Sequence, residues 1–255
     1  MTPTLVRHDP VRDWVEIQER MLAPLYEAVY ERLGVGDRTR LLALDCGSGL
    51  ALLMAAARGA RVAGRDPDEA RLAHARQRLA AYDADLDADR PTPGPYDVVT
   101  AFHPAGCGTR APGAPPDAVT RSAVRGAAVV LAGWGPPERC ASATVLGLAA
   151  RLAETGAGPG AGAHWPPALH DLDEQVARAG LRPDGSGRVA CPFGYADLDS
   201  AVRGLMSTGV FDPAASATDA SQVEKELAEA LHPYIRRDGT VWMPNVFRYV
   251  IARVP

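Results

Sequence analysis

Residues 13–33 have the hydrophobic pattern of an amphipathic helix. Their apolar side chains recur at steps of three and four residues, which places them on one face of a helix. Pro24 falls inside this segment, and a proline in a helix interior removes a backbone hydrogen bond and kinks the helix. We therefore expect a helical segment that is bent or divided at Pro24. Its apolar stripe consists of Trp14, Ile17, Met21, Leu25, Val29 and Leu33.

From residue 40 onward, short apolar runs alternate with helix-like segments. The runs have the length of buried strands, and they lie at residues 40–45, 61–64, 96–102 and 127–134. One helix is predicted over 50–58, with Gly59 as the C-cap glycine that follows it. A second is predicted over 67–81, with Pro67 at the first helical position. Strands that alternate with helices form βαβ units with right-handed crossovers. The sequence therefore predicts an α/β fold around a mostly parallel sheet, with helices on both faces.

The last third of the chain is predicted to complete this core and to add a small cap. Late strands are expected at 189–193 and 246–254, and helical segments at 171–180, 196–207 and 223–231. We divide the chain into an N-terminal helical cover (1–36), a Rossmann-like core (37–150) and the rest of the core with a substrate-cap insertion (151–255, the insertion at about 196–240). Two long loops rich in glycine, proline and alanine, 104–118 and 155–168, are typical of lids or linkers.

A glycine-containing turn joins the first predicted strand to its helix. The segment Leu44-Asp-Cys-Gly-Ser-Gly-Leu50 lets a ligand approach the backbone closely and offers free N–H groups at a helix start. Asp66 ends the next strand, 19 residues beyond Gly47, where such folds place a carboxylate for ribose hydroxyls. In a nicotinamide-dinucleotide fingerprint the third glycine would fall at Leu52, so a dehydrogenase is disfavoured.

With these motifs the chain resembles the class I S-adenosylmethionine (SAM) dependent methyltransferases, most of all the small-molecule enzymes of high-GC bacteria. The resemblance rests on TRLLALDCGSGLALLMAAARGARVAGRDPDEARLAHAR, PYDVVTAF, VVLAGWGPPERC, VACPFGYADLDSAVRGLMSTG and FRYVIARVP. It implies a Rossmann-like methyltransferase fold with a small helical cap. It also implies SAM contacts at Gly47, Gly49 and Asp66.

The glycine turn departs from the family pattern, which is an acidic residue, any residue, and then Gly-x-Gly-x-Gly. An alignment without gaps puts Ala43 at the acidic position and Asp45 at the first glycine, with Gly47 and Gly49 as the other two. A second alignment makes Asp45 the acid and Ala51 the third glycine. It shortens the following helix by two residues, which turns the buried face of that helix by about 160°. We prefer the alignment without gaps.

In the preferred alignment Asp45 stands where the family's first glycine accommodates the methionyl group of SAM. A side-chain carboxylate would fill that space and repel the cofactor's own carboxylate by about 1–4 kcal/mol. Ala43 also removes the acid that organises the family's loop. The cap segments keep their family pattern, and the sequence therefore suggests a scaffold that retains a small-molecule cavity but holds SAM weakly.

Asp45 and His103 are the candidate catalytic residues. A carboxylate in a desolvated site has the raised basicity that a general base needs, and it could also anchor an ammonium group. Alternatively, Asp45 is a loop residue that caps the following helix. His103 ends the third predicted strand, at the sheet edge where α/β sites lie, and it could instead be a loop hydrogen-bonder. Asp97, at the start of that strand, is predicted to be structural.

Five further residues are candidates for binding the substrate. Trp14 and Gln18 resemble the family's active-site cover, while Trp134, Phe193 and Tyr195 could line a cavity. Packing in the hydrophobic core is the alternative for all five.

Composition narrows the function classes. A net charge of −4 provides no basic surface for nucleic acid or anionic membranes. The apolar runs are too short to span a bilayer and the N-terminus lacks the pattern of a signal peptide, so we expect a cytoplasmic protein. The four cysteines form no C-x-x-C pair, which indicates free thiols, and no metal site is expected.

Three functions follow from these observations. The preferred hypothesis is an enzyme of specialised metabolism that acts without SAM. It would catalyse the cyclisation of a small amine-bearing intermediate or an elimination reaction on it. The second is an active SAM-dependent small-molecule methyltransferase, for which SAM would be the cofactor. The third is a non-catalytic methyltransferase-like subunit. A small-molecule substrate is expected in the first two cases, and a partner protein or a homodimer is compatible with the sequence.

Overall fold

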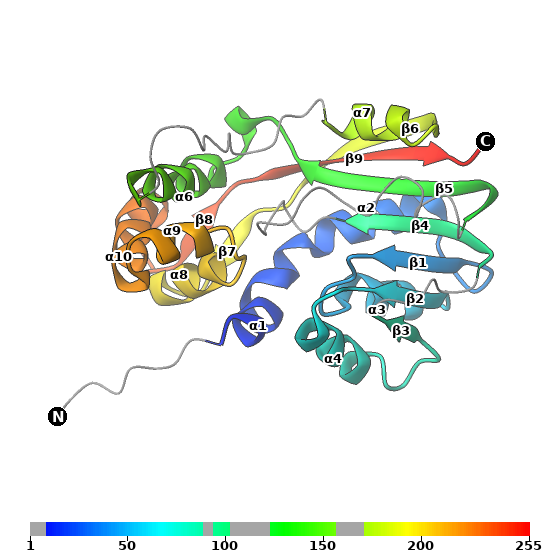
Figure 1. The fold of residues 1–255 in the computed structure, drawn as a ribbon, viewed down its shortest axis with the longest axis horizontal. Coiled ribbons are helices and arrows are strands. Elements are labelled where there is room, and N and C mark those ends of the chain that lie inside the picture. The colour runs from blue at the N-terminus through cyan, green and yellow to red at the C-terminus, as the bar shows by residue number, and fades with distance from the viewer. Residues whose placement is uncertain (1–8, 89–93, 103–122, 157–170) are drawn as a thin grey trace.

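The structure is a computed structural model, which describes residues 9–88, 94–102, 123–156 and 171–255. Its centre is a seven-stranded sheet with the strand order β3-β2-β1-β4-β5-β9-β6 (Figure 1). The first five strands in this order are parallel, and β9 is antiparallel to both of its neighbours. The strands are β1 (Arg40–Leu44), β2 (Arg61–Arg65), β3 (Asp85–Asp87), β4 (Tyr96–Phe102), β5 (Ala123–Trp134), β6 (Arg182–Ala190) and β9 (Val246–Arg253). The predicted α/β fold with four adjacent parallel strands is confirmed.

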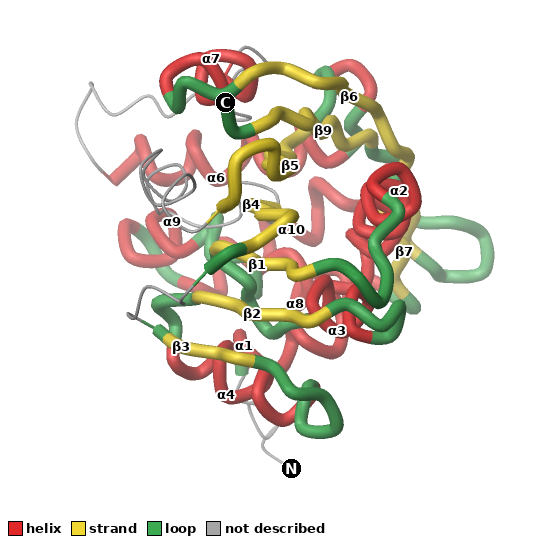
Figure 2. The backbone as a smooth tube through the Cα atoms, turned by 90° about the vertical axis from the view of Figure 1, so that its right-hand side faces the viewer, coloured by secondary structure: helices red, strands yellow, loops and turns green. Residues whose placement is uncertain are grey.

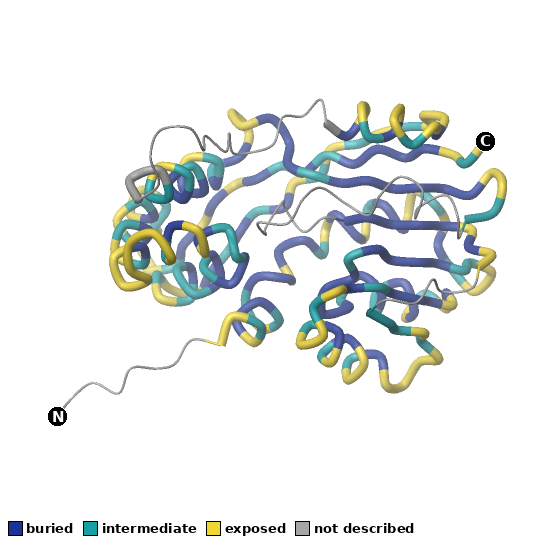
Figure 3. The backbone as a smooth tube through the Cα atoms, in the orientation of Figure 1, coloured by how far each residue is buried: buried dark blue, intermediate teal, exposed yellow. Residues whose placement is uncertain are grey.

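The two faces of the sheet form two hydrophobic cores. Because side chains alternate along a strand, Leu41 and Ala43 of β1 pack in one core and Leu42 and Leu44 in the other. The first core contains α2 (Ala23–Leu33) and α3 (Leu50–Ala56), and the second contains α7 (Asp171–Arg178). Figure 2 shows α2 and α3 on one side of the sheet and α7 on the other. The central strands are dark blue along most of their length in Figure 3, as expected for strands buried on both faces.

The N-terminal segment is divided, as Pro24 predicts. It consists of α1 (Pro10–Asp13), a π-helical turn η1 (Trp14–Gln18), a 3₁₀ turn η2 (Glu19–Leu22) and then α2. Pro24 lies in the first turn of α2, where its missing N–H would have no helical partner. In Figure 1 the segment runs past the carboxyl ends of β1 and β4.

The predicted cap lies between β6 and β9. It contains a two-stranded antiparallel sheet of β7 (Phe193–Tyr195) and β8 (Val241–Met243). Its helices are α8 (Leu198–Met206), α9 (Asp212–Ala217), α10 (Ala220–Leu231) and the 3₁₀ turn η4 (His232–Tyr234). Together with α6 (Ser142–Gly156), these helices form the group at the left of Figure 1. A 3₁₀ turn, η3 (Pro137–Arg139), precedes α6.

Two predicted elements need correction. The helix after β2 is α4 (Glu69–Arg78), and it begins after Asp68 rather than at Pro67. The Asp68 carboxylate accepts hydrogen bonds from the N–H groups of Ala70 and Arg71, so it is the N-cap. The strand expected at 189–193 is replaced by β6, which starts earlier, and by the separate strand β7.

Candidate functional site

The turn after β1 contains three left-handed residues at alternate positions. Asp45, Gly47 and Gly49 have φ angles of 53°, 58° and 80°. Asp45 is the only non-glycine residue with positive φ among the described residues, and aspartate tolerates this conformation better than most residues. The three positions match the three glycines of the alignment without gaps. The alternative third glycine, Ala51, lies inside α3, so the backbone favours Asp45 in the first glycine position.

Gly49 packs against the next helix. A Cβ atom added at Gly49 would lie 2.9 Å from the Cβ of Ala75 in α4. The third glycine position therefore serves close helix packing, and Gly49 does not line the cavity described next.

A pocket that is partly open to solvent lies between this turn and the N-terminal segment, with about 320 Å³ of empty space when the adjoining open solvent is included. Residues from the ends of β1 and β4 form one side, and residues from η1, η2 and α2 form the other. The predicted residues Asp45, Gly47 and Trp14 all line it. The lining residues are Trp14, Glu19, Tyr26, Ala43, Leu44, Asp45, Cys46, Gly47, Ala51, Thr100 and Phe102.

Asp66 is held by the backbone of the loops beside it. Its Oδ2 accepts a hydrogen bond from the Gly47 N–H at 2.7 Å, and its Oδ1 accepts one from the Asp68 N–H at 2.9 Å. Burial raises the pKa of Asp66, and these two backbone donors oppose the shift. The carboxylate predicted to bind ribose hydroxyls thus fixes the glycine turn in this structure.

Glu19 is a site residue that the sequence analysis missed. Its Oε1 accepts a hydrogen bond from the Leu50 N–H at 3.2 Å, at the start of α3. Its Oε2 lies 2.6 Å from Nη1 of Arg78, which also donates to the Ser48 carbonyl at 2.8 Å. The Glu19 side chain is only 4% exposed. Glu19 belongs to the N-terminal helical pattern, and no sequence signal separates it from the other acidic residues there.

Three carboxylates act on the Cys46 thiol beside the glycine turn. Burial raises the pKa of the Cys46 thiol, and the carboxylates of Asp66, Asp45 and Glu19 raise it further. Cys46 therefore stays protonated, which disfavours it as a nucleophile.

The other predicted substrate residues lie outside this cavity. Gln18 and Tyr195 are buried and joined by a hydrogen bond of 2.8 Å from the tyrosine hydroxyl to Oε1 of Gln18. Trp134 and Phe193 belong to the core, with their ring centroids 5.7 Å apart. His103 lies outside the described residues.

The structure also bears on the predictions for Asp97 and for the cysteines. Asp97 accepts a hydrogen bond from the Arg40 N–H at 2.9 Å, which confirms a structural contact for this residue. Cys46, Cys140 and Cys191 are free thiols.

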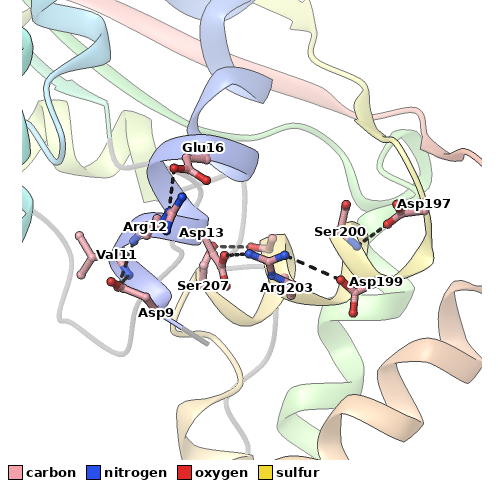
Figure 4. A network of polar contacts seen from close by, with 11 residues as sticks. Asp9, Val11, Arg12, Asp13, Glu16, Asp197, Asp199, Ser200, Arg203 and Ser207 are labelled. Atoms are coloured by element: carbon pink, nitrogen blue, oxygen red, sulfur yellow. Dashed lines mark hydrogen bonds and ion pairs between the residues drawn. The ribbon is translucent and has the colours of Figure 1, made fainter. Parts of the chain in front are cut away.

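An ion pair connects the N-terminal segment to the cap (Figure 4). Nη2 of Arg203, in α8, lies 2.5 Å from Oδ1 of Asp13, whose side chain is buried. Because Asp13 is buried, this ion pair should contribute more to stability than a pair between two exposed side chains. The N-terminal segment is thus bound both to the cap, through Asp13, and to the core, through Glu19.

The described residues contain no group of three or more histidine, cysteine or acidic residues placed to hold a metal ion. None of the helices in the described part of the chain is long and apolar enough to cross a membrane.

Comparisons with known proteins identify the fold. No protein-family model and no curated protein matches the sequence. A proposed methyltransferase from Bacillus halodurans C-125 has a similar structure, with a TM-score of 0.56, 13% identity and coverage of 90% of this chain and 98% of the other. Geranyl diphosphate C-methyltransferase from Streptomyces coelicolor A3(2) is similar with a TM-score of 0.51 and 15% identity, covering 92% of this chain and 77% of the other.

A third similar structure is that of the [4+2]-cyclase SpnF. Its TM-score is 0.54 at 16% identity, and the match covers 98% of this chain and 86% of the other. Together with the strand order, these likenesses show that the chain has the class I SAM-dependent methyltransferase fold.

Proposed function

We propose that the chain is a small-molecule enzyme that uses the methyltransferase fold without SAM and catalyses cyclisation or elimination of an amine-bearing substrate. One observation carries this proposal. Asp45 has the backbone conformation of a glycine position, yet it is an acidic residue that lines the cavity. Backbone outliers of this kind cluster at functional sites.

The residues around the cavity do not fit SAM well. The cofactor carries a carboxylate of its own, and the glycine turn presents Asp45 where the family has no side chain. Glu19 adds a second carboxylate, which already accepts the Leu50 N–H that an anionic ligand could otherwise use. Asp66 is engaged by two backbone N–H groups. Like charges a few ångströms apart in a partly desolvated site repel by about 1–4 kcal/mol.

The same features suit a substrate with a protonated amine. Asp45 can pair with the ammonium group, or it can accept a proton from the substrate as a general base. A cavity that holds the substrate in one orientation and excludes water supplies much of what a cyclisation or elimination needs. His103 is proposed to assist, as the sequence suggests.

The fold is compatible with such a reaction but does not determine which reaction is catalysed. SpnF is described as a [4+2]-cyclase, and geranyl diphosphate C-methyltransferase as a methyltransferase. The choice between these activities therefore rests on the residues of this cavity.

Calorimetric titration with SAM and S-adenosylhomocysteine tests the proposal. We expect dissociation constants above about 100 µM, which corresponds to a binding free energy no more favourable than about −5.5 kcal/mol. The variants Asp45→Gly and Ala43→Asp should each bind SAM more tightly. Asp45→Asn is the matched control, because it keeps the side-chain volume and removes the charge, and so separates steric from electrostatic exclusion.

A micromolar constant for the unmodified protein would contradict the proposal and support an active methyltransferase. Conversion of a substrate only in the presence of a second protein would instead support a subunit of a larger enzyme.

A further inference from the structure

Two buried polar atoms at the cavity have no hydrogen-bond partner. They are Nε1 of Trp14 and Oγ1 of Thr100. Trp14 is 2% exposed and Thr100 is fully buried, and both residues line the cavity. Buried polar groups in proteins are nearly always hydrogen-bonded, so two exceptions at one cavity require an explanation.

Strand pairing explains why the Thr100 hydroxyl has no partner within the sheet. Thr100 of β4 lies beside Ala43 of β1 and Val130 of β5. Neighbouring residues in register project their side chains to the same face of a sheet. Neither alanine nor valine can accept or donate a hydrogen bond through its side chain, so neither neighbour in the sheet can pair with the hydroxyl.

One face of the Trp14 indole ring contacts an arginine side chain. The guanidinium carbon of Arg71 lies 5.3 Å from the centroid of the ring, within the range of a cation–π contact. The indole N–H can only donate a hydrogen bond. The atom that satisfies it must therefore be an acceptor.

We propose that Trp14 and Thr100 bind a carbonyl oxygen of the substrate. A carbonyl oxygen has two lone pairs and can accept both N–H and O–H donors. Asp45, at the same cavity, then faces the charged part of the substrate. This inference rests on the proposed function, because it places the substrate in this cavity, and it specifies the substrate class as an amino-carbonyl compound.

Tropinone and tropane are suitable probes. Tropinone contains a basic amine and a ketone in one compact ring system, and tropane is the same amine without the ketone. Because each hydrogen bond changes affinity by roughly 3- to 10-fold, tropinone should bind at least about 3-fold more tightly than tropane. It should also shift the Trp14 indole N–H signal in nitrogen–proton NMR spectra, a signal assigned by its loss in Trp14→Phe.

Substitution of the two donors should remove the preference for the ketone. In Trp14→Phe and Thr100→Val, the affinity for tropinone should fall toward that for tropane, and tropane binding should hardly change. Thr100→Val should also raise the melting temperature slightly, because it removes an unpaired buried hydroxyl and nearly preserves shape.

Two substitutions outside the cavity serve as controls. Trp242→Phe makes the same change at an exposed tryptophan of β8 and should leave both affinities unchanged. Thr208→Val removes a buried hydroxyl that donates to the Leu205 carbonyl at 2.6 Å, and it should lower the melting temperature.

Equal affinities for the two probes, binding of neither, or a lower melting temperature in Thr100→Val would overturn this inference. Ordered water alone at these donors would produce the first of these results. Tight SAM binding would overturn the proposed function. Weak SAM binding by an unmodified protein that shows no preference for the ketone would overturn only the assignment of Trp14 and Thr100.

Discussion

At the scale of single residues, Asp45 combines a left-handed backbone with a position that lines the cavity. Most residues adopt positive φ at a cost of about 1 kcal/mol or more, and aspartate and asparagine tolerate it best. The turn nevertheless places an acidic residue at this cavity, which Glu19, paired with Arg78, also lines.

Replacement of Asp45 by asparagine should separate a structural role in the loop from a role in the reaction. Asparagine has nearly the same shape as aspartate and tolerates the left-handed conformation as well, so the melting temperature should hardly change. If Asp45 is the base or the ammonium anchor, turnover of the substrate should fall by about 10²-fold or more, because asparagine can neither carry the charge nor take the proton. Thermal denaturation and steady-state kinetics measure the two effects.

Asp45→Ala is the control for the backbone, since alanine lacks the polar side chain that eases positive φ and should lower the melting temperature. Full activity in Asp45→Asn would make Asp45 a structural residue and direct attention to His103 and the cap.

Some of the site could be predicted from single residues, and some could not. The spacing of Asp45, Gly47 and Gly49 indicated a ligand-binding turn, because strand, turn and helix follow one another directly in the chain. The contacts of Glu19 depend on a meeting between the N-terminal segment and two later helices. Contacts between segments that are distant in the chain cannot be predicted from a local sequence pattern.

At the scale of elements, the pattern predicts best where burial is complete. β1, β2, β4 and the central part of β5 are apolar because helices cover both faces, so their runs were recognisable. β3 has three residues, two of them acidic, and β6 is an exposed edge strand that contains proline and glycine. Neither has a continuous apolar run. The start of α4 was misplaced because Pro67 is a helix signal beside the stronger N-cap Asp68.

The corrected start of α4 can be tested by substitution. Asp68→Ala removes the acceptor for the Ala70 and Arg71 N–H groups and should cost about 1 kcal/mol. For a chain of this size, the melting temperature should fall by about 2–4 °C. Asp68→Asn should be nearly neutral, and Pro67→Ala should matter less than Asp68→Ala. A larger effect at Pro67 than at Asp68 would restore the helix start predicted from the sequence.

At the scale of the whole molecule, the N-terminal segment joins parts that are far apart in the chain. Glu19 connects it to α3 and α4 of the core, and Asp13 connects it to α8 of the cap (Figures 1 and 4). The segment also provides Trp14, Glu19 and Tyr26 to the cavity. The cavity therefore depends on the position of a segment that is held by charged contacts as well as by its apolar stripe.

Substitution of Glu19 should reveal how much these charged contacts contribute. Glu19→Gln can still accept the Leu50 N–H but loses the ion pair, which leaves Arg78, 19% exposed, with only the Ser48 carbonyl. Removing one partner of a buried pair costs about 3 kcal/mol or more. Urea unfolding should show this loss with an unchanged m-value. Glu16→Gln is the matched control, since Glu16 pairs with Arg12 on the surface and its loss should not be measurable.

The double substitution Glu19→Gln with Arg78→Met should recover much of the lost stability, because no charge is then left unpaired. If Glu19→Gln proves as harmless as Glu16→Gln, apolar packing alone holds the N-terminal segment. In that case the carboxylate at the start of α3 would be free to serve a ligand, and its effect on SAM binding would have to be measured alongside that of Asp45.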